Sequence, residues 1–503
     1  MRNQMRNVSR RSFVKGAAGG ALVGALPFAI WAEGQAQAQA PVIRHEVSTP
    51  QGQAMLEKYA RAVAKMMDTS QIAEGNPASW LFHWYTHGVA GNRTMADEIA
   101  RIYANAPPSD PNRLLALAMW NTCQAHGLSD LPQEERMFLP WHRMYVYFFE
   151  RIIRKVLADD SFTLPYWDYT ADGKHAIPEQ FRTPNDPVFK SLFRADRNDG
   201  SLPGRANVNA GEPIDLNAPG NPLNADSLGQ RDYDRTGVVQ GFNEMLDFNV
   251  HGAIHVLVGV RTNMGSPPWA ARDPIFWIHH CNIDRFWASW NFAGRRNPTG
   301  SSWLNQSFVF ADENGNRVDS VVRDFVDTAT IRVGPYKYDK LLPVPQLPPI
   351  PADATVLAAA PSTIAVQAQP GAIDLSAAAP VSVPLTTAAV PMSTHLQAAG
   401  PNRRVYLVLQ NVQAQAQPEV LYAVYLDAPG AIAAPPTAPV GTMHFFDAVA
   451  HGTGRPTRVY SFDVTDRVKA IGGASAPTIR IAPVGTPAAD ARPVIGGVSL
   501  VVQ

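Results

Sequence analysis

This chain of 503 residues has only two cysteines, a formal net charge of zero and few long apolar segments. The two cysteines, Cys123 and Cys281, cannot build a disulfide framework. The 43 basic side chains balance the 43 acidic ones, so charge gives no reason to expect nucleic acid or an anionic membrane as a partner. Apolar residues make up 46% of the sequence, which indicates a globular protein with room for more than one domain. The composition leaves open whether the chain forms a homo-oligomer.

One longer apolar run, residues 16–32, follows a basic segment near the N-terminus. The sequence Ser-Arg-Arg-Ser-Phe-Val-Lys at 9–15 is similar to a twin-arginine export signal, and small residues suited to cleavage follow at 34–40. The alternative is a basic tail beside an incidental helix. We therefore expect residues 1–40 to be a signal peptide, which leaves the mature chain without a membrane span and places it in the periplasm or outside the cell.

Histidine occurs in two aromatic-rich segments that lie far apart in the sequence. The first is Phe-Leu-Pro-Trp-His-Arg at 138–143, and the second is Asp-Pro-Ile-Phe-Trp-Ile-His-His-Cys-Asn-Ile-Asp-Arg at 273–285. Before the second segment, His251 and His255 are four residues apart, so both imidazoles can point from one helix face toward a single ion. Imidazole-only ligation suits copper, zinc or iron. The alternative, histidines packed in an aromatic core, is the usual fate of a lone histidine.

These segments resemble the two copper-site signatures of the tyrosinase, catechol oxidase and haemocyanin family. One signature is Phe-Leu-Pro-Trp-His-Arg with Glu150 eight residues after His142, and the other is Asp-Pro-x-Phe-x-x-x-His-x-x-x-Asp ending at Asp284. In this family each copper takes three histidines. The resemblance implies two copper ions, with dioxygen as co-substrate, in a mainly α protein whose catalytic domain is a four-helix bundle.

For the second copper, the resemblance implies that His251, His255 and His280 are the ligands. His279 is the alternative for the third place because it is adjacent in sequence. The family pattern puts the ligand four residues after the phenylalanine of Asp-Pro-x-Phe, which is Phe276 here, and this spacing selects His280.

For the first copper, His142 lies in the signature itself and the other two ligands are less direct. His87 is favoured because Ser-Trp followed by His-Gly resembles the family's first ligand segment, and we interpret His83, four residues earlier, as packing or as a support behind a ligand. The remaining ligand normally lies nine residues before His142, where this chain has Gln133. The nearest candidate is His126, in a segment similar to the family's Cys-Gln-His-Gly with residues inserted.

Cys123 lies three residues before His126. In several relatives a cysteine near this ligand is joined to its imidazole by a thioether bond, so the resemblance implies a Cys123–His126 thioether here. The alternative is a reduced thiol that behaves as a small hydrophobe. An intact mass two hydrogens below the sequence value, unchanged by reductant, would identify the bond.

The resemblance also implies roles for residues beside the ligands. We expect Phe276 to shape the substrate pocket, and Asp284, one helical turn beyond the last ligand, to orient a ligand imidazole. Some relatives place a glutamate four residues before the first ligand of the second copper and an asparagine directly after that ligand. Asp247 and Gly252 hold those positions here, so Asp247 is the candidate base for a phenol unless it is an ordinary helix acid or Glu244 replaces it. The shorter acid and the missing amide argue against efficient hydroxylation.

The mature chain is predicted to have two domains. Residues 41–340 carry helical periodicity and end near a Tyr-x-Tyr motif that resembles the close of the family's catalytic domain. Residues 341–400 are rich in proline and alanine and lack lysine and arginine, which predicts an extended linker. Short β-rich runs in 401–503 predict a smaller β-sandwich, similar to the shielding domain of latent polyphenol oxidases, with an aromatic or methionine side chain near the substrate entrance. The alternative is a permanent stability or assembly domain.

Together these features predict an exported copper oxidoreductase that acts on small phenols and catechols. It would use dioxygen to ortho-hydroxylate monophenols, to oxidise o-diphenols to o-quinones, or both. The alternatives are a catechol oxidase or o-aminophenol oxidase without monophenolase activity and a haemocyanin-like dioxygen carrier. A bacterial-type export signal and a single copper domain argue against the carrier.

Overall fold

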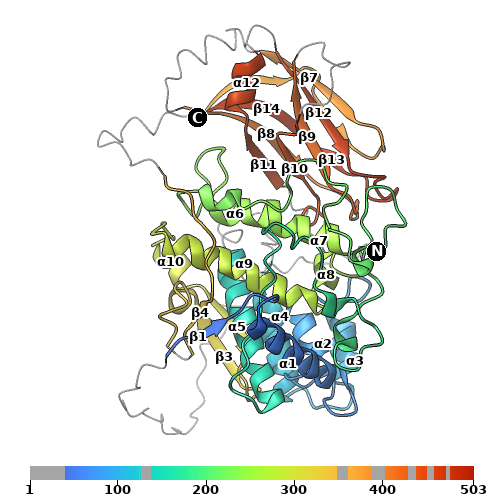
Figure 1. The fold of residues 1–503 in the computed structure, drawn as a ribbon, viewed down its shortest axis with the longest axis vertical. Coiled ribbons are helices and arrows are strands. Elements are labelled where there is room, and N and C mark those ends of the chain that lie inside the picture. The colour runs from blue at the N-terminus through green and yellow to red at the C-terminus, as the bar shows by residue number, and fades with distance from the viewer. Residues whose placement is uncertain are drawn as a thin grey trace, which may run out of the picture. The chain divides into compact units, whose positions relative to one another are not determined.

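The computed structural model divides the chain into residues 1–40 and a compact unit, 41–503. The residues that it describes are 40–123, 125, 137–332, 334–347, 361–387, 403–428, 438–449, 458–471 and 476–503. The predicted signal peptide, except for residue 40, and the predicted ligand His126 therefore lie outside the described residues. In the compact unit most helices precede most strands along the chain (Figure 1).

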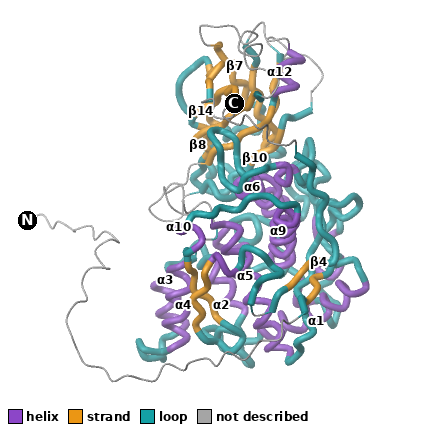
Figure 2. The backbone as a smooth tube through the Cα atoms, turned by 90° about the vertical axis from the view of Figure 1, so that its left-hand side faces the viewer, coloured by secondary structure: helices purple, strands orange, loops and turns teal. Residues whose placement is uncertain are grey.

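Helices dominate the part of the unit before residue 305 (Figure 2). The α-helices are α1 (Pro50–Met67), α2 (Trp80–His87), α3 (Met95–Ile102), α4 (Pro111–Thr122), α5 (Phe138–Leu157), α6 (Phe242–Leu246), α7 (Gly252–Val258), α8 (Pro267–Ala270), α9 (Ile275–Phe292) and α10 (Ser301–Leu304), with α12 (Thr465–Ile471) near the C-terminus. A π-helix, η7 (Asp247–His251), joins α6 to α7, and short 3-10 helices occur at Glu179–Phe181, Lys190–Leu192, Val208–Ala210, Asp226–Gly229 and Val322–Asp324. None of the helices in the described ranges is both long enough and apolar enough to cross a membrane.

Side-chain caps and buried aromatic rings explain why the ligand-bearing helices form where they do. The Ser79 hydroxyl accepts the Phe82 N–H at the start of α2, which satisfies one of the free amides of the first turn. Helices α5 and α9 are buried over most of their length, and Phe149 of α5 stacks on Trp277 of α9 with ring centroids 3.5 Å apart. Because these two helices fill the core of this part, side chains on their facing sides are held rigidly.

Strands build the C-terminal part and two small sheets beside the helices. The strands are β1 (Val42–Arg44), β2 (Ser307–Ala311), β3 (Arg317–Val321), β4 (Tyr336–Tyr338), β5 (Ser362–Gln367), β6 (Ile373–Asp374), β7 (Val381–Thr387), β8 (Val405–Val412), β9 (Tyr422–Asp427), β10 (Gly441–Met443), β11 (Arg458–Asp463), β12 (Thr478–Pro483), β13 (Val494–Ile495) and β14 (Gly497–Val502). Eight of them form one sheet in the order β10-β9-β12-β7-β5-β14-β8-β11. Inward side chains from both halves of this sheet share one apolar core, so the halves pack face to face as in a sandwich.

The predicted linker 341–400 is wrong over residues 361–387, because β5, β6 and β7 lie there and β5 and β7 belong to the eight-stranded sheet. Strand β7 pairs with β12 through Val381 to Pro384 and with β5 through Leu385 to Thr387. Pro384 thus lies where the strand changes neighbours, a position where the missing N–H of proline is tolerated.

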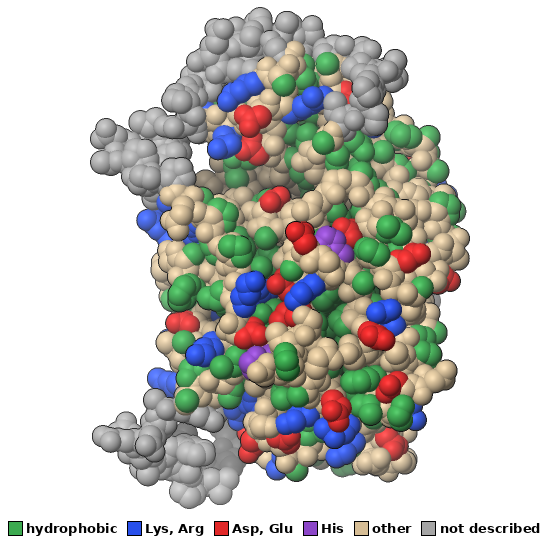
Figure 3. Space-filling view, in the orientation of Figure 1, with side chains coloured by type: hydrophobic (Ala, Val, Ile, Leu, Met, Phe, Trp, Pro, Cys, Tyr) green, Lys and Arg blue, Asp and Glu red, His purple; other side chains and the backbone are tan. Residues whose placement is uncertain are grey.

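Acidic and basic side chains are interspersed on the face shown in Figure 3, in agreement with the formal net charge of zero. This face offers no extended patch of one sign. The expectation that charge does not recruit a nucleic acid or an anionic membrane stays a prediction.

Candidate metal centre

Four helical segments bring the described candidate ligands together. His87 is the last residue of α2, His142 lies in the first turns of α5, His251 and His255 lie on η7 and α7, and His280 lies on α9. All five side chains are buried. The sixth predicted ligand, His126, is outside the described residues, so its position stays a prediction.

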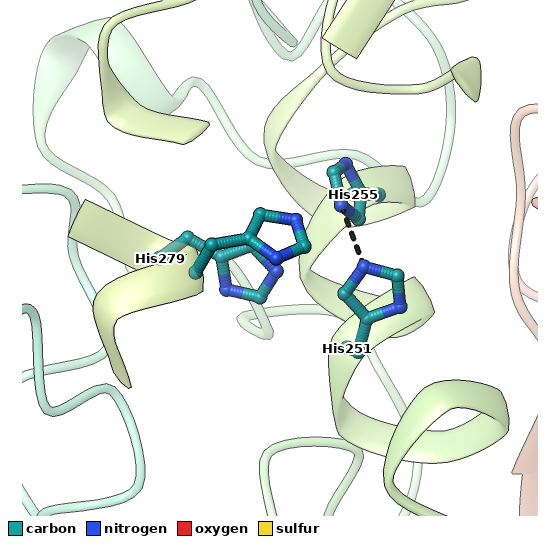
Figure 4. Close-up of side chains that lie close together, drawn as sticks. His251, His255 and His279 are labelled. Atoms are coloured by element: carbon teal, nitrogen blue, oxygen red, sulfur yellow. Dashed lines mark hydrogen bonds between the residues drawn. The ribbon is translucent and has the colours of Figure 1, made fainter. Parts of the chain in front are cut away.

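His251 and His255 point toward the same space, with their Nε2 atoms 3.0 Å apart (Figure 4). The Nδ1 atom of His255 lies 2.8 Å from the carbonyl oxygen of Met264, which can only accept, so Nδ1 must donate. The Nδ1 atom of His251 lies 3.3 Å from the Asp247 carbonyl and 2.9 Å from its carboxylate. In the neutral rings both Nε2 atoms therefore carry lone pairs. Two lone pairs this close are stabilised by a shared cation, and so the pair fits a metal ion.

His87 and His142 are prepared in the same way. The Nδ1 atom of His87 donates to the carbonyl oxygen of Pro267, and the Nδ1 atom of His142 donates to the carbonyl oxygen of Phe138. Each donor–acceptor distance is 2.9 Å. Their ring centroids lie 5.6 Å apart. The neutral tautomer thus leaves Nε2 as the ligand atom in each ring, which suits a second metal position.

The two clusters adjoin one another through His142 and His280. Their rings stack with centroids 4.1 Å apart and an interplanar angle of 10°. Phe276 lies against this junction, 4.2 Å from His280 and 4.9 Å from His87 between ring centroids. The structure therefore gathers five of the predicted ligands and Phe276 in one buried centre.

His279 lies next to His280 and to His251, with ring centroids 4.9 Å and 5.4 Å away. It stacks on His251 at 5.4 Å and contacts Tyr169 at 5.5 Å, whereas His280 contacts His142. The nitrogen atoms of His279 and His280 have no hydrogen-bond partner among the described residues, and both belong to a group of four histidines that can hold a metal ion. Burial lowers the pKa of His279 to about 3, so its ring is neutral. His280 differs from His279 in its stacking contact with His142. Which of the two is the third ligand stays a prediction.

His83 lies among aromatic rings rather than in the centre. Its ring contacts Phe149 at 5.3 Å and Trp277 at 6.1 Å. Burial lowers its pKa to about 3, so it is a neutral core side chain. This geometry corresponds to the packing alternative.

Among the described residues, the partners of the Asp284 carboxylate are tyrosines and arginines and include no ligand imidazole, so its predicted orienting role finds no support there. The Asp284 carboxylate accepts hydrogen bonds from the hydroxyls of Tyr336 and Tyr338, each at 2.6 Å, and forms ion pairs with Arg143 and Arg44. Burial alone would raise its pKa, but the two guanidinium groups lower it below the ordinary value. Two buried cations are stronger partners than a neutral imidazole. Asp284 therefore ties α5 and α9 to strands β1 and β4, behind the metal centre.

Asp247 has the position that was predicted for Asp284. Its carboxylate lies 2.9 Å from Nδ1 of His251, the ring nitrogen that does not face His255. A carboxylate at this nitrogen fixes the tautomer and makes the opposite nitrogen a better ligand. The role of Asp247 as a base toward substrate stays a prediction, and Glu244, the alternative, is paired with Arg235 at 3.0 Å.

The C-terminal part contributes residues that the sequence did not single out by number. The Phe446 ring stacks on His255 with centroids 4.1 Å apart and an interplanar angle of 12°. The Asp447 carboxylate belongs to a close group with Asp247 and His251. An aromatic side chain from this part was expected near the substrate entrance, and the run His-Phe-Phe-Asp at 444–447 was the signal that could have located it.

Cys123 lies beside this centre and donates to the carbonyl of His87 over 3.6 Å. Desolvation raises the pKa of its thiol to about 12, so the group stays protonated in this arrangement. Its predicted partner His126 is not described, and the thioether stays a prediction.

A helical core that holds a buried group of histidines able to bind a metal ion is followed by a β-rich C-terminal part, which defines a mainly helical fold with a candidate metal centre. Two family models match the chain directly. Residues 80–293 match the common central domain of tyrosinase, and residues 297–350 match the polyphenol oxidase middle domain. The chain belongs to the tyrosinase and polyphenol oxidase family.

Curated relatives resemble part of the chain. A tyrosinase of Hahella sp. is 32% identical over 317 residues, which cover 58% of this chain and 62% of that protein. The chloroplastic polyphenol oxidase of Malus domestica is 30% identical over 215 residues, covering 39% of this chain and 36% of that protein. The matched segments are thus less than two thirds of these relatives' own lengths.

Solved structures resemble nearly the whole fold. The latent apple tyrosinase covers 93% of this chain and 99% of its own, with a TM-score of 0.58 and 19% identity. A latent aurone synthase covers 92% of this chain and 90% of its own, with a TM-score of 0.60 and 19% identity. At this identity the likeness shows the fold, a helical domain followed by a β-rich C-terminal domain.

Proposed function

We propose that this chain is a dicopper oxidoreductase that uses dioxygen to oxidise small phenols and catechols. The donor chemistry of the centre supports copper: it offers buried neutral imidazoles whose Nδ1 atoms are engaged by carbonyl or carboxylate oxygens. His87, His142 and His126 would hold one ion, and His251, His255 and His280 the other. Bound there, the two ions would supply the binding site for dioxygen and the electrons for its reduction.

The observation that best supports a phenolic substrate is the stacking of the Phe446 ring on His255. It shows that a planar six-membered ring fits flat against one of the predicted ligands. A phenol that replaced Phe446 would place its oxygen toward the histidine cluster, with Phe276 as a wall. The protein would thereby orient the substrate and exclude water.

Oxidation of o-diphenols is the favoured reaction within this function. Asp247 is engaged with His251, and Gly252 offers no amide to help hold a water for phenol deprotonation. Within the proposed function these observations favour a catechol oxidase or o-aminophenol oxidase over an enzyme that also hydroxylates monophenols.

The β-rich C-terminal part would keep the enzyme latent, because Phe446 occupies the place proposed for the substrate ring. The test compares the copper-loaded chain with and without residues 345–503, using oxygen uptake and quinone formation on a monophenol and on its matching catechol. Turnover of either substrate by the truncated chain supports the function, and a lower rate in the longer chain supports latency. Reversible dioxygen binding without turnover by either form would instead indicate a carrier.

Export by the twin-arginine route is a separate proposal, supported by the paired arginines, Arg10 and Arg11, before the apolar run. Replacing both by lysine should retain the protein, as a full-length precursor, inside the cell. Unchanged appearance of processed protein in the periplasm or medium would contradict it.

A further inference from the structure

Gly252 lies directly under a side chain from the β-rich part. This residue follows His251 and begins α7 with helical dihedral angles, φ −68° and ψ −28°. A Cβ atom added here would lie 1.9 Å from Cε1 and 2.2 Å from Nε2 of His444. The His444 imidazole therefore rests on the bare backbone of the helix, and the contact exists only because position 252 has no side chain.

The His444 ring is fixed from the β side, so it cannot simply turn away. Its Nδ1 atom accepts the backbone N–H of Phe446 at 3.3 Å, and the Tyr460 hydroxyl donates to the His444 carbonyl at 2.8 Å. The side chain is buried, and backbone groups of Phe248 and Asn249 interact with it. The same hydrogen bond that fixes the ring also fixes Phe446, which stacks on His255.

Glycine is not required here by the conformation of the helical part itself. The φ angle is negative, so any residue can adopt it, and alanine has a higher helix propensity than glycine. The three atoms nearest to an added Cβ all belong to His444. The closest clashes of a side chain at position 252 are therefore with the β-rich part.

We propose that the bare helix backbone at Gly252 is the surface against which His444 packs when the β-rich part covers the metal centre. We call this contact surface the seat. Any side chain at position 252 displaces His444, and with it the Phe446 ring that covers His255. The residue after the first ligand of the second cluster thus decides whether the enzyme can be shielded. This inference rests on the shielding role proposed above.

The experiment measures hydrogen exchange of the full chain without copper, over residues 247–258 and 438–449. Gly252→Ala should raise exchange in both segments at least tenfold over the unsubstituted chain. The double variant Gly252→Ala with His444→Ala should recover most of the protection, because the new methyl group enters the space that the imidazole leaves. Gly229→Ala is the matched control, since an added Cβ there meets nothing within 4 Å, and it should change neither segment.

Two results would overturn the proposal. Protection in Gly252→Ala equal to that of the unsubstituted chain would mean that His444 moves aside without opening the interface. Equal loss of protection in the single and double variants would mean that another contact fails.

Copper-loaded activity of the same proteins separates this inference from the proposed function. If the truncated chain does not oxidise catechols, the proposed function fails, while the exchange data still report on the seat. If the truncated chain is active, and Gly252→Ala opens the full chain without raising its rate, closure at Gly252 does not shield the centre and the inference is wrong.

Discussion

Under the proposed shielding, replacing Phe446 by alanine should convert a latent enzyme into an active one. The ring is fully buried and stacks on His255 at 4.1 Å, so its loss removes both apolar burial and a ring contact from the closed arrangement. Truncating a buried phenylalanine costs about 3 to 5 kcal/mol. Taking about 3 kcal/mol, the ratio of closed to open protein falls roughly a hundredfold.

Initial rates of quinone formation from a small catechol should therefore rise by up to roughly a hundredfold in copper-loaded Phe446→Ala. The rate of the chain without residues 345–503 sets the ceiling. The control is Phe292→Ala, because Phe292 is 83% exposed and the same substitution there should leave latency unchanged. Thermal unfolding of both variants would show that the β-rich part remains folded.

A latent rate in Phe446→Ala, together with a high rate in the truncated chain, would refute this reasoning. The shield would then act without the stacked ring, and the fit of Phe446 on His255 would no longer support a phenolic substrate.

Three further predictions concern groups around the same centre. Asp247→Asn should weaken copper binding about tenfold to a hundredfold, measured by competition with a chelator, because the carboxylate supports His251. His280→Ala should reduce the copper content measured by mass spectrometry, whereas His279→Ala should retain it. Burial lowers the pKa of His444 to about 4 from 6.5, although Asp447 opposes this shift. Closure is therefore fully stable above pH 6.5 and weakens as the pH falls toward 4, at about 1.4 kcal/mol per unit. Hydrogen exchange of residues 438–449 measured against pH should show this opening.

Local spacing accounts for the parts of the centre that could be predicted from the sequence. Residues four apart share one face of a helix, so His251 and His255 could be placed together without any structure. The two signatures extended this reasoning to His142 and His280, because each carries a ligand at a fixed distance from aromatic core residues. The gathering of these side chains in the structure follows the same spacing.

The roles of the acids could not be predicted in the same way, because they depend on contacts across the fold. Asp284 is one turn from His280, but Arg143 of α5 and Tyr338 of β4 are the partners that reach its carboxylate. No spacing within α9 identifies these distant residues. The sequence shows Asp247 as an acid one turn before His251. Only the structure shows that its carboxylate lies beside Nδ1 of that imidazole.

The start of the β-rich part was predicted to be a linker because its high proline and alanine content was given more weight than its short β-rich runs. Proline and alanine made residues 341–400 resemble a linker, whereas β5 and β7 are stabilised there by pairing with β14 and β12, more than 90 residues later. Nonlocal pairing of this kind leaves little trace in a short window of sequence.

Shielding and phenol hydroxylation place opposite demands on position 252. An amide there, as some relatives have, would help to hold a water beside the second metal, but any side chain there would collide with the seated His444. Glycine at position 252 allows His444 to pack against the helix, but it provides no side-chain amide to hold a water. The same residue thus explains two features that the sequence presented separately, an acid and glycine pattern unsuited to hydroxylation and a β-rich domain suited to latency. The proposed latency and the proposed preference for catechols would then both follow from one missing side chain.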